Sequence, residues 1–190
     1  MKNSFKGLMI VLTVSLIMLG VISCSPSNKS LEEQTDSLLY YDETMDNGII
    51  RMNSIKYSDS IKTNTNCYLY QIERQPDSTL PNVKDQYSEL VYLDNRIDVH
   101  ILKDGKEFFR HSFVKSDFKS FLDEGFMKYG ILEGFVFDRT TGNSLRFATS
   151  VSFPQSDMYI PLIVTINNQG QYDIQRDNIM EEASSNTSEE

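Results

Sequence analysis

The middle of the chain alternates between apolar and polar residues, which is the pattern of β-strands that bury one face. Tyr68, Tyr70 and Ile72 alternate in "TNCYLYQIE", and the segments "NGIIRMNSIKY" and "SELVYLD" also predict strands. Further along, "HILKDGKEFF", "FDRTTGNSLRF" and "VTINNQGQYDI" each place a glycine at the end of a polar turn between apolar stretches. These three segments predict β-hairpins.

The first hairpin can close in two ways. A two-residue turn of Asp104 and Gly105 would pair Lys103 with Lys106. A three-residue loop, with Gly105 left-handed in a bulge, would pair Leu102 with Lys106 instead. The two pairings differ by one residue, which moves every side chain of one strand to the opposite face of the sheet.

The side chains favour the three-residue loop. It places Asp98 opposite Arg110, and such a pair of opposite charges stabilises a sheet. It also gathers apolar residues on one face, namely Ile97, Val99, Ile101, Phe109 and Phe113. Each hairpin then has one apolar face, as an antiparallel sheet with one covered side requires. The same loop in the other hairpins pairs Phe135 with Phe147, Phe137 with Leu145, Ile166 with Tyr172 and Val164 with Ile174.

One helix is predicted between the first and second hairpins, in "KSDFKSFLDEGFMKYG". Ser116 can cap its start and Gly130 its end. Strands, one helix and further strands predict an α+β fold, mainly an antiparallel β-sheet of meandering hairpins with one amphipathic helix packed on it. The apolar stripe of this helix has helical spacing and consists of Phe118, Phe121, Leu122, Phe126 and Tyr129.

The first 24 residues have the layout of a secretory signal that ends at a cysteine. Lys2 and Lys6 precede residues 7–23, which carry no charge and are rich in apolar side chains. The segment "VISC" resembles the bacterial lipobox, and an uncleaved membrane helix is the alternative. The resemblance implies that residues 1–23 are a signal peptide. It also implies that Cys24 begins the mature chain, with diacylglycerol on its thiol and an acyl group such as palmitate on its amine.

Several acyl chains hold a protein on a lipid bilayer without spanning it. Ser25 stands where an aspartate would resemble an inner-membrane retention signal, and no cluster of lysine and acidic residues directly follows Cys24. We therefore expect a lipid anchor in the outer membrane of the cell envelope, with the domain in the periplasm. Exposure at the cell surface is the alternative.

The chain is acidic, with a formal net charge of −9 that becomes −11 when the two lysines of residues 1–23 are removed. Nucleic-acid binding depends on clustered lysine and arginine, so no nucleic-acid partner is expected. Composition divides the mature chain into a tether at residues 24–47, a single α+β domain at 48–176 and a disordered acidic tail at 177–190.

Two histidines on the first hairpin, His100 and His111, have Asp98 and Glu107 nearby and could suggest a metal or acid–base site. In the favoured register, His100 shares the face of Asp98, whereas His111 lies on the face of the phenylalanines. The two histidines then cannot bind one ion. We expect no metal site, no catalytic residue and no cofactor.

Cys67 alternates with Leu69 and is predicted to be a small apolar core residue, with an intermolecular disulfide as the alternative. Because lipidation would use the thiol of Cys24, the sequence predicts a fold without an internal disulfide. No cysteine-protease signature surrounds Cys67.

As a whole, the chain resembles small lipoproteins of Bacteroides-type gut bacteria and, in particular, a domain-of-unknown-function family, number 4738. The features that carry the resemblance are the lipobox, the centre "DNRIDVHILKDGKEFFRHSFVKSDF" and the last glycine-turn hairpin. The resemblance implies location and size but no activity. We expect a non-enzymatic binding or assembly accessory with an envelope protein partner. The alternative is a module that binds a glycan or a small hydrophobic ligand.

Overall fold

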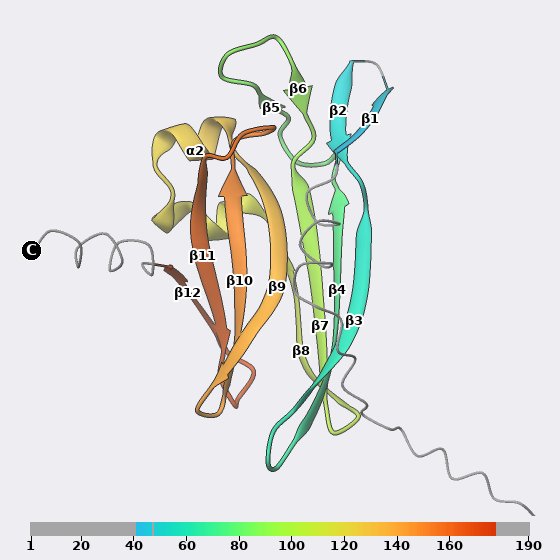
Figure 1. Ribbon diagram of the computed structural model, residues 1–190, viewed down its shortest axis with the longest axis vertical. Coiled ribbons are helices and arrows are strands. Elements are labelled where there is room, and N and C mark those ends of the chain that lie inside the picture. The colour runs from blue at the N-terminus through green and yellow to red at the C-terminus, as the bar shows by residue number, and fades with distance from the viewer. Residues whose placement is uncertain (1–40, 47, 178–190) are drawn as a thin grey trace, which may run out of the picture.

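The computed structural model describes residues 41–46 and 48–177, and they form three four-stranded sheets with two short helical segments (Figure 1). The strands of the first half are β1 (Tyr41–Asp46), β2 (Ile49–Met52), β3 (Ile55–Lys62), β4 (Cys67–Pro76), β5 (Val83–Lys84), β6 (Val91–Tyr92), β7 (Asn95–Lys103) and β8 (Lys106–Phe113). The remaining elements are η1 (Lys115–Phe121), α2 (Glu124–Tyr129), β9 (Ile131–Thr141), β10 (Ser144–Ser152), β11 (Tyr159–Ile166) and β12 (Tyr172–Arg176).

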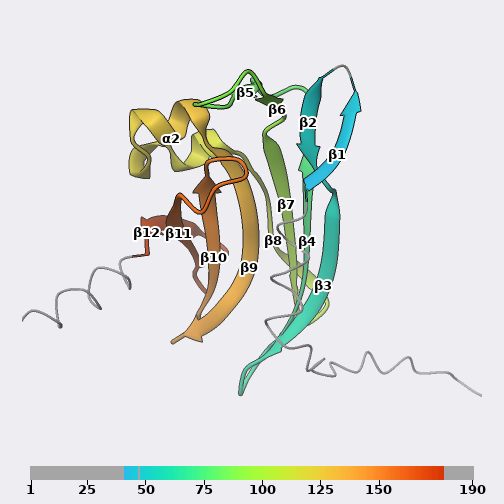
Figure 2. The same cartoon turned by 45° about the horizontal axis from the view of Figure 1, so that its top comes forward.

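Two of the sheets form a sandwich. The N-terminal large sheet has the strand order β3-β4-β7-β8, and the C-terminal large sheet has the order β12-β11-β10-β9. Both are antiparallel throughout. The small sheet, with the order β1-β2-β6-β5, lies at one end of the sandwich, and the tips of the long hairpins lie at the other end (Figures 1 and 2).

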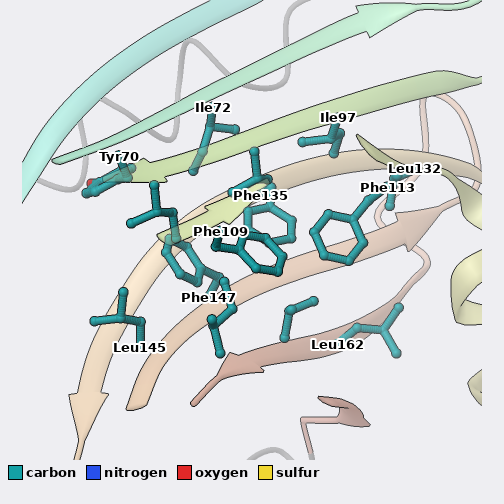
Figure 3. Packing of buried hydrophobic residues seen from close by; sticks show 14 of the residues in the cluster. Tyr70, Ile72, Ile97, Phe109, Phe113, Leu132, Phe135, Leu145, Phe147 and Leu162 are labelled. Carbon is teal, nitrogen blue, oxygen red and sulfur yellow. The ribbon is translucent and has the colours of Figure 1, made fainter. Parts of the chain in front are cut away.

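The hydrophobic core fills the space between the two large sheets (Figure 3). Tyr70 and Ile72 of β4 point inward, as their alternation predicts, and aromatic rings stack across the interface. The ring centroids of Phe113 and Phe135 are 5.0 Å apart, and those of Phe135 and Phe147 are 5.2 Å apart. The mainly antiparallel fold class is confirmed, and each large sheet covers the apolar face of the other.

The first hairpin confirms the predicted faces but not the predicted pairs. Its turn is the two-residue one, since Asp104 and Gly105 have φ of 50° and 79° and Lys103 pairs with Lys106. The register then shifts because Phe108 is an extra residue, a β-bulge in β8. The predicted pairing of Leu102 with Lys106 and of Asp98 with Arg110 is therefore wrong. Arg110 lies opposite His100, and Asp98 lies opposite Ser112.

The other two hairpins differ in how far the prediction holds. In the second, the turn pairs Thr141 with Ser144, and β9 bulges once near Asp138 and again near Glu133. The predicted pairs are wrong there, because Phe137 lies opposite Phe147, and Phe135 opposite Thr149, although the core face is as expected. The third hairpin is confirmed, with Val164 opposite Ile174 and Ile166 opposite Tyr172.

The predicted helix is two short segments rather than one. Leu122 is extended, with φ −103° and ψ 140°, so the 3₁₀ helix η1 ends there and α2 begins anew. Asp117 accepts a hydrogen bond from the Val114 N–H at 2.9 Å, whereas Ser116 was expected to cap. Gly130 does follow the last turn. The predicted stripe meets the core, to which Phe118, Phe121, Leu122 and Phe126 contribute.

The ends of the folded domain lie slightly outside the predicted limits. β1 pairs with β2, so residues 41–46, which were assigned to the tether, form a strand. Asp177 was assigned to the tail, but its N–H donates to the Pro161 carbonyl at 3.0 Å and its carboxylate accepts from Arg146 at 3.1 Å. Among the described residues, no helix is long and apolar enough to span a membrane.

Candidate functional site

The hairpin end of the sandwich contains a groove of about 430 Å³, which we call the loop-end groove. Three turns that are far apart in sequence surround it: the β3–β4 turn, the β9–β10 turn and the β11–β12 turn (Figure 1). The end of β7 completes the wall. The lining residues are Thr63, Asn64, Thr65, Asn66, Tyr68, Lys103, Thr140, Gly142, Asn143, Ser144, Leu145 and Asn168.

The floor of the groove is the last layer of the core. Tyr68 of the N-terminal large sheet and Leu145 of the C-terminal large sheet are both buried in the core and line the groove. Lys103 continues the inward-facing series of β7 one step beyond Ile101 and lies opposite Tyr68 in the sheet. Its Nζ is 5.7 Å from the centroid of the Tyr68 ring and 5.6 Å from that of Phe108. Such cation–π contacts hold the ammonium group at the rim of the groove.

The turns around the groove are held by their own hydrogen bonds. In the β3–β4 turn, the Thr63 hydroxyl donates to the Asn66 carbonyl at 3.2 Å and accepts from the Asn66 N–H at 3.1 Å. In the β11–β12 turn, Asn167 Oδ1 accepts the N–H groups of Gln169 and Gln171 at 2.9 and 3.0 Å. Short polar side chains that bond to nearby backbone stabilise tight turns in this way.

Gly170 brings the β11–β12 turn against the first hairpin. Its φ is 75°, and a Cβ atom at this position would come within 2.6 Å of the carbonyl oxygen of Phe108. The bulge residue Phe108 therefore contacts both the turn that walls the groove and the lysine at its rim. A side chain at position 170 would therefore have to push the β11–β12 turn away from β8.

Side-chain amides and hydroxyls dominate the lining. Lys103 is the charged member of the described lining residues, and within the described chain it takes part in no ion pair. The amides of Asn64, Asn143 and Asn168 come from three different turns, and none of them is used in a hydrogen bond inside the described part of the molecule. The groove therefore presents several hydrogen-bonding groups and one positive charge.

The two histidines lie on opposite faces, as predicted. His100 Nε2 is 3.0 Å from Arg110 Nη2 and 3.2 Å from Glu107 Oε2 on the outer face. Hydrogen bonds from Arg110, together with its charge, lower the pKa of the Glu107 carboxyl. His111 lies on the inner side, 3.4 Å from the Tyr172 hydroxyl. No group of three potential metal ligands occurs among residues 41–46 and 48–177.

Cys67 differs from its prediction. It is disulfide-bonded and only partly buried, so it is not a small apolar core residue, and the fold does contain a disulfide. Cys67 and Leu69 do lie on the same face of β4, as their alternation predicted. That face is the outer one, however, while Tyr68, Tyr70 and Ile72 point into the core. The lipidation call on Cys24 lies outside the described residues.

A buried polar network ties the sheets together at the opposite end. Arg74 of β4 donates to the Glu133 carbonyl of β9 at 2.9 Å and to the Asn53 carbonyl at 3.0 Å, so one guanidinium joins the two large sheets and the link between β2 and β3. Lys115 Nζ lies 3.1 Å from Asp94 Oδ2 and donates to the Gly130 carbonyl at 2.6 Å. Both cationic side chains therefore have backbone or carboxylate partners, and we assign the network a structural role.

The sequence patterns did not predict the loop-end groove. One available signal was Lys103, a lysine that extends a series of core-facing residues and so had to lie where the core meets solvent. Another was the richness of the turns in Asn and Thr, in "TNTN", "TTGN" and "INNQG". Neither signal shows that the turns meet, since that depends on how the two large sheets pack.

Comparison with known proteins gives one result. No curated protein matches the chain. A family model described as "Domain of unknown function (DUF4738)" matches residues 34–174. The match spans every strand except the last two residues of β12, and it confirms the resemblance to this family that was drawn from the sequence. The chain therefore belongs to the DUF4738 family.

Proposed function

We propose that this protein is a lipid-anchored envelope protein whose folded domain is a non-enzymatic binding module. The observation that carries the proposal is the loop-end groove, whose volume lies in the range typical of ligand sites, about 300–1,000 Å³. Its amides and hydroxyls suit ligand recognition rather than proton transfer, since these groups do not titrate near neutral pH.

The sequence of the first 24 residues supports the anchor. A basic start, an uncharged apolar stretch and "VISC" suit lipidation of Cys24 and a place in the outer membrane, with the domain on the periplasmic side. Labelling of cells with a palmitate analogue tests this directly. The label should appear on the wild-type chain and on Cys67→Ala, and it should be absent from Cys24→Ala.

Protease shaving of intact and permeabilised cells tests the side of the membrane. Protection that is lost only after permeabilisation agrees with a periplasmic domain. Cleavage in intact cells would contradict that placement and would put the binding module at the cell surface.

A ligand screen tests the binding role. The mature chain should show a thermal shift with some member of a panel of saccharides, and Asn64→Ala should reduce the shift without changing the melting temperature of the ligand-free protein. Absence of any shift across saccharides, lipids and peptides would contradict a ligand-binding groove.

A second candidate function is contact with an envelope protein partner. Three large side chains are exposed: Tyr87, in the loop between β5 and β6, is 82% exposed, Met158, in the loop before β11, is 50% exposed, and Tyr159, at the start of β11, is 46% exposed. Exposed aromatic and methionine side chains are enriched at protein interfaces. A photo-crosslinker placed at Tyr87 should give one dominant adduct in cells if this function is correct, whereas one placed at Asn64 should not.

A further inference from the structure

The charge of the loop-end groove is opposite to that of the protein. The chain has a formal net charge of −9, yet the described lining of the groove contains one lysine and no carboxylate. An ammonium group within a concave site attracts an anion, and the attraction is stronger where the neighbouring walls are apolar. Lys103 meets that condition, because the rings of Tyr68 and Phe108 lie beneath it.

Lys103 is also held in position. Its stem extends from a strand end, and two aromatic rings contact its ammonium group, so less side-chain entropy is lost when an anion binds. The three N–H groups of an ammonium can only donate hydrogen bonds. The group that binds there must therefore accept them, as a carboxylate or a sulfate does.

The remaining lining suits a molecule with many hydroxyl groups. Asn64, Asn143 and Asn168 approach the groove from three sides, and each amide offers both donors and an acceptor. A hydroxyl group also donates and accepts, so neighbouring hydroxyls on a sugar ring can pair with such amides. The narrow apolar floor at Leu145 can contact the C–H face of a ring.

We propose that the loop-end groove binds an acidic saccharide, with the carboxylate or sulfate on Lys103 and the hydroxyls on the asparagines of the surrounding turns. This inference rests on the proposed function, because it specifies the ligand of the same groove. The inference predicts that the groove prefers an anionic sugar to a neutral one, and a saccharide to an acidic peptide.

The test is calorimetric titration of the mature chain with paired probes. Tetrasaccharides of galacturonate, glucuronate and sulfated galactose are each compared with the methyl-esterified or desulfated form of the same sugar. At least one acidic form should bind, its neutral partner should bind about tenfold more weakly, and added salt should weaken the binding of the acidic form.

Variants assign the effect to the groove. Lys103→Met should lower the affinity for the acidic probe about tenfold. Lys106→Met is the matched control, because Lys106 lies directly opposite Lys103 in the hairpin, is exposed and does not line the groove. It removes the same charge and should leave the affinity unchanged. Asn64→Ala should weaken binding of both probe forms. If Lys103→Met fails to fold, Asn64→Ala still tests whether the probes bind in the groove.

The other outcomes separate the inference from the proposed function. Equal affinity for the acidic and neutral forms would overturn the inference and leave a saccharide-binding module. Binding of an acidic peptide, such as tetraglutamate, with no saccharide bound would overturn the ligand class. No binding of any probe would overturn the inference. If the wider screen of saccharides, lipids and peptides also gave no thermal shift, that result would contradict the proposed binding function of the groove.

Discussion

At the scale of single residues, Gly130 decides how closely α2 approaches β10. A Cβ atom at this position would come within 2.6 Å of the Phe126 carbonyl oxygen and 2.7 Å of Val151 Cγ1. We expect Gly130→Ala to lower the free energy of unfolding by about 1–3 kcal/mol, because backbone or core must move. Urea denaturation measures the change. Gly134→Ala is the control, since a Cβ atom there meets nothing within 4 Å and should leave stability nearly unchanged.

Tyr70 predicts how stability depends on alkaline pH. Burial, and then the negative charge of Asp59, raise the pKa of the Tyr70 hydroxyl well above its usual value. In the unfolded chain a tyrosine loses its proton near pH 10, whereas the folded chain retains it. Stability should therefore be complete below about pH 10 and should fall as the pH rises further.

The substitution Tyr70→Phe should make this alkaline decline shallower in chemical denaturation above about pH 10. Some slope should remain, because burial also raises the pKa of Tyr57. Tyr87→Phe, at a residue that is 82% exposed, should leave the decline as it is in the wild type. Equal slopes for wild type and Tyr70→Phe would show that the folded chain does not protect this hydroxyl.

At the scale of elements, the hairpins show what alternation can and cannot predict. Alternation fixes which residues share a face, so it allows registers that differ by two residues. The first hairpin uses a two-residue turn, in which Asp104 and Gly105 both adopt positive φ, and then restores the core face with the bulge at Phe108. The chosen faces were right for this reason, while the pairs were wrong by two residues.

The spacing of apolar residues also did not predict the break between η1 and α2. Spacing of apolar residues predicted one helix, and the side chains do meet the core. Asp123, however, accepts a hydrogen bond from the Phe126 N–H at 2.9 Å and so begins a second helix within the predicted one. A capping residue in the middle of an apolar stripe was the available signal.

Asp123→Ala should therefore lower the free energy of unfolding by about 1 kcal/mol, the usual cost of losing an N-terminal cap. Glu124→Ala, in the next position and exposed, should cost only a few tenths of a kcal/mol. Thermal denaturation of both variants measures the difference. Equal losses would mean that the Asp123 carboxylate does not hold the start of α2.

At the scale of the whole molecule, the sequence predicted strands and faces but not the partner of each face. A helix was expected to cover the sheet, whereas two large sheets cover one another. Sheet-on-sheet packing depends on contacts between residues as distant as Tyr70 and Phe147, whose rings are 5.9 Å apart. The loop-end groove is a product of that packing, so hairpin patterns alone could not predict it.

The bonding of the two cysteines also depends on the whole molecule. The sequence contains two cysteines, and Cys67 is disulfide-bonded. One sulfur atom cannot form both a thioether and a disulfide, so lipidation of Cys24 and a disulfide between Cys24 and Cys67 exclude one another. If Cys24 is lipidated, peptide mapping of the mature protein under non-reducing conditions should find Cys67 as a free thiol or linked to another molecule. A peptide that joins Cys67 to Cys24 would contradict lipidation.

The place where the described chain begins bears on how far the protein can reach. β1 enters the fold in the small sheet, at the end of the sandwich opposite the loop-end groove (Figure 1). Tyr41 lies seventeen positions after Cys24, and an extended chain advances at most about 3.6 Å per residue, so this segment spans at most about 60 Å. A domain anchored at Cys24 would therefore carry its groove at the end farthest from the anchor. The groove could then meet ligands at a distance from the bilayer surface.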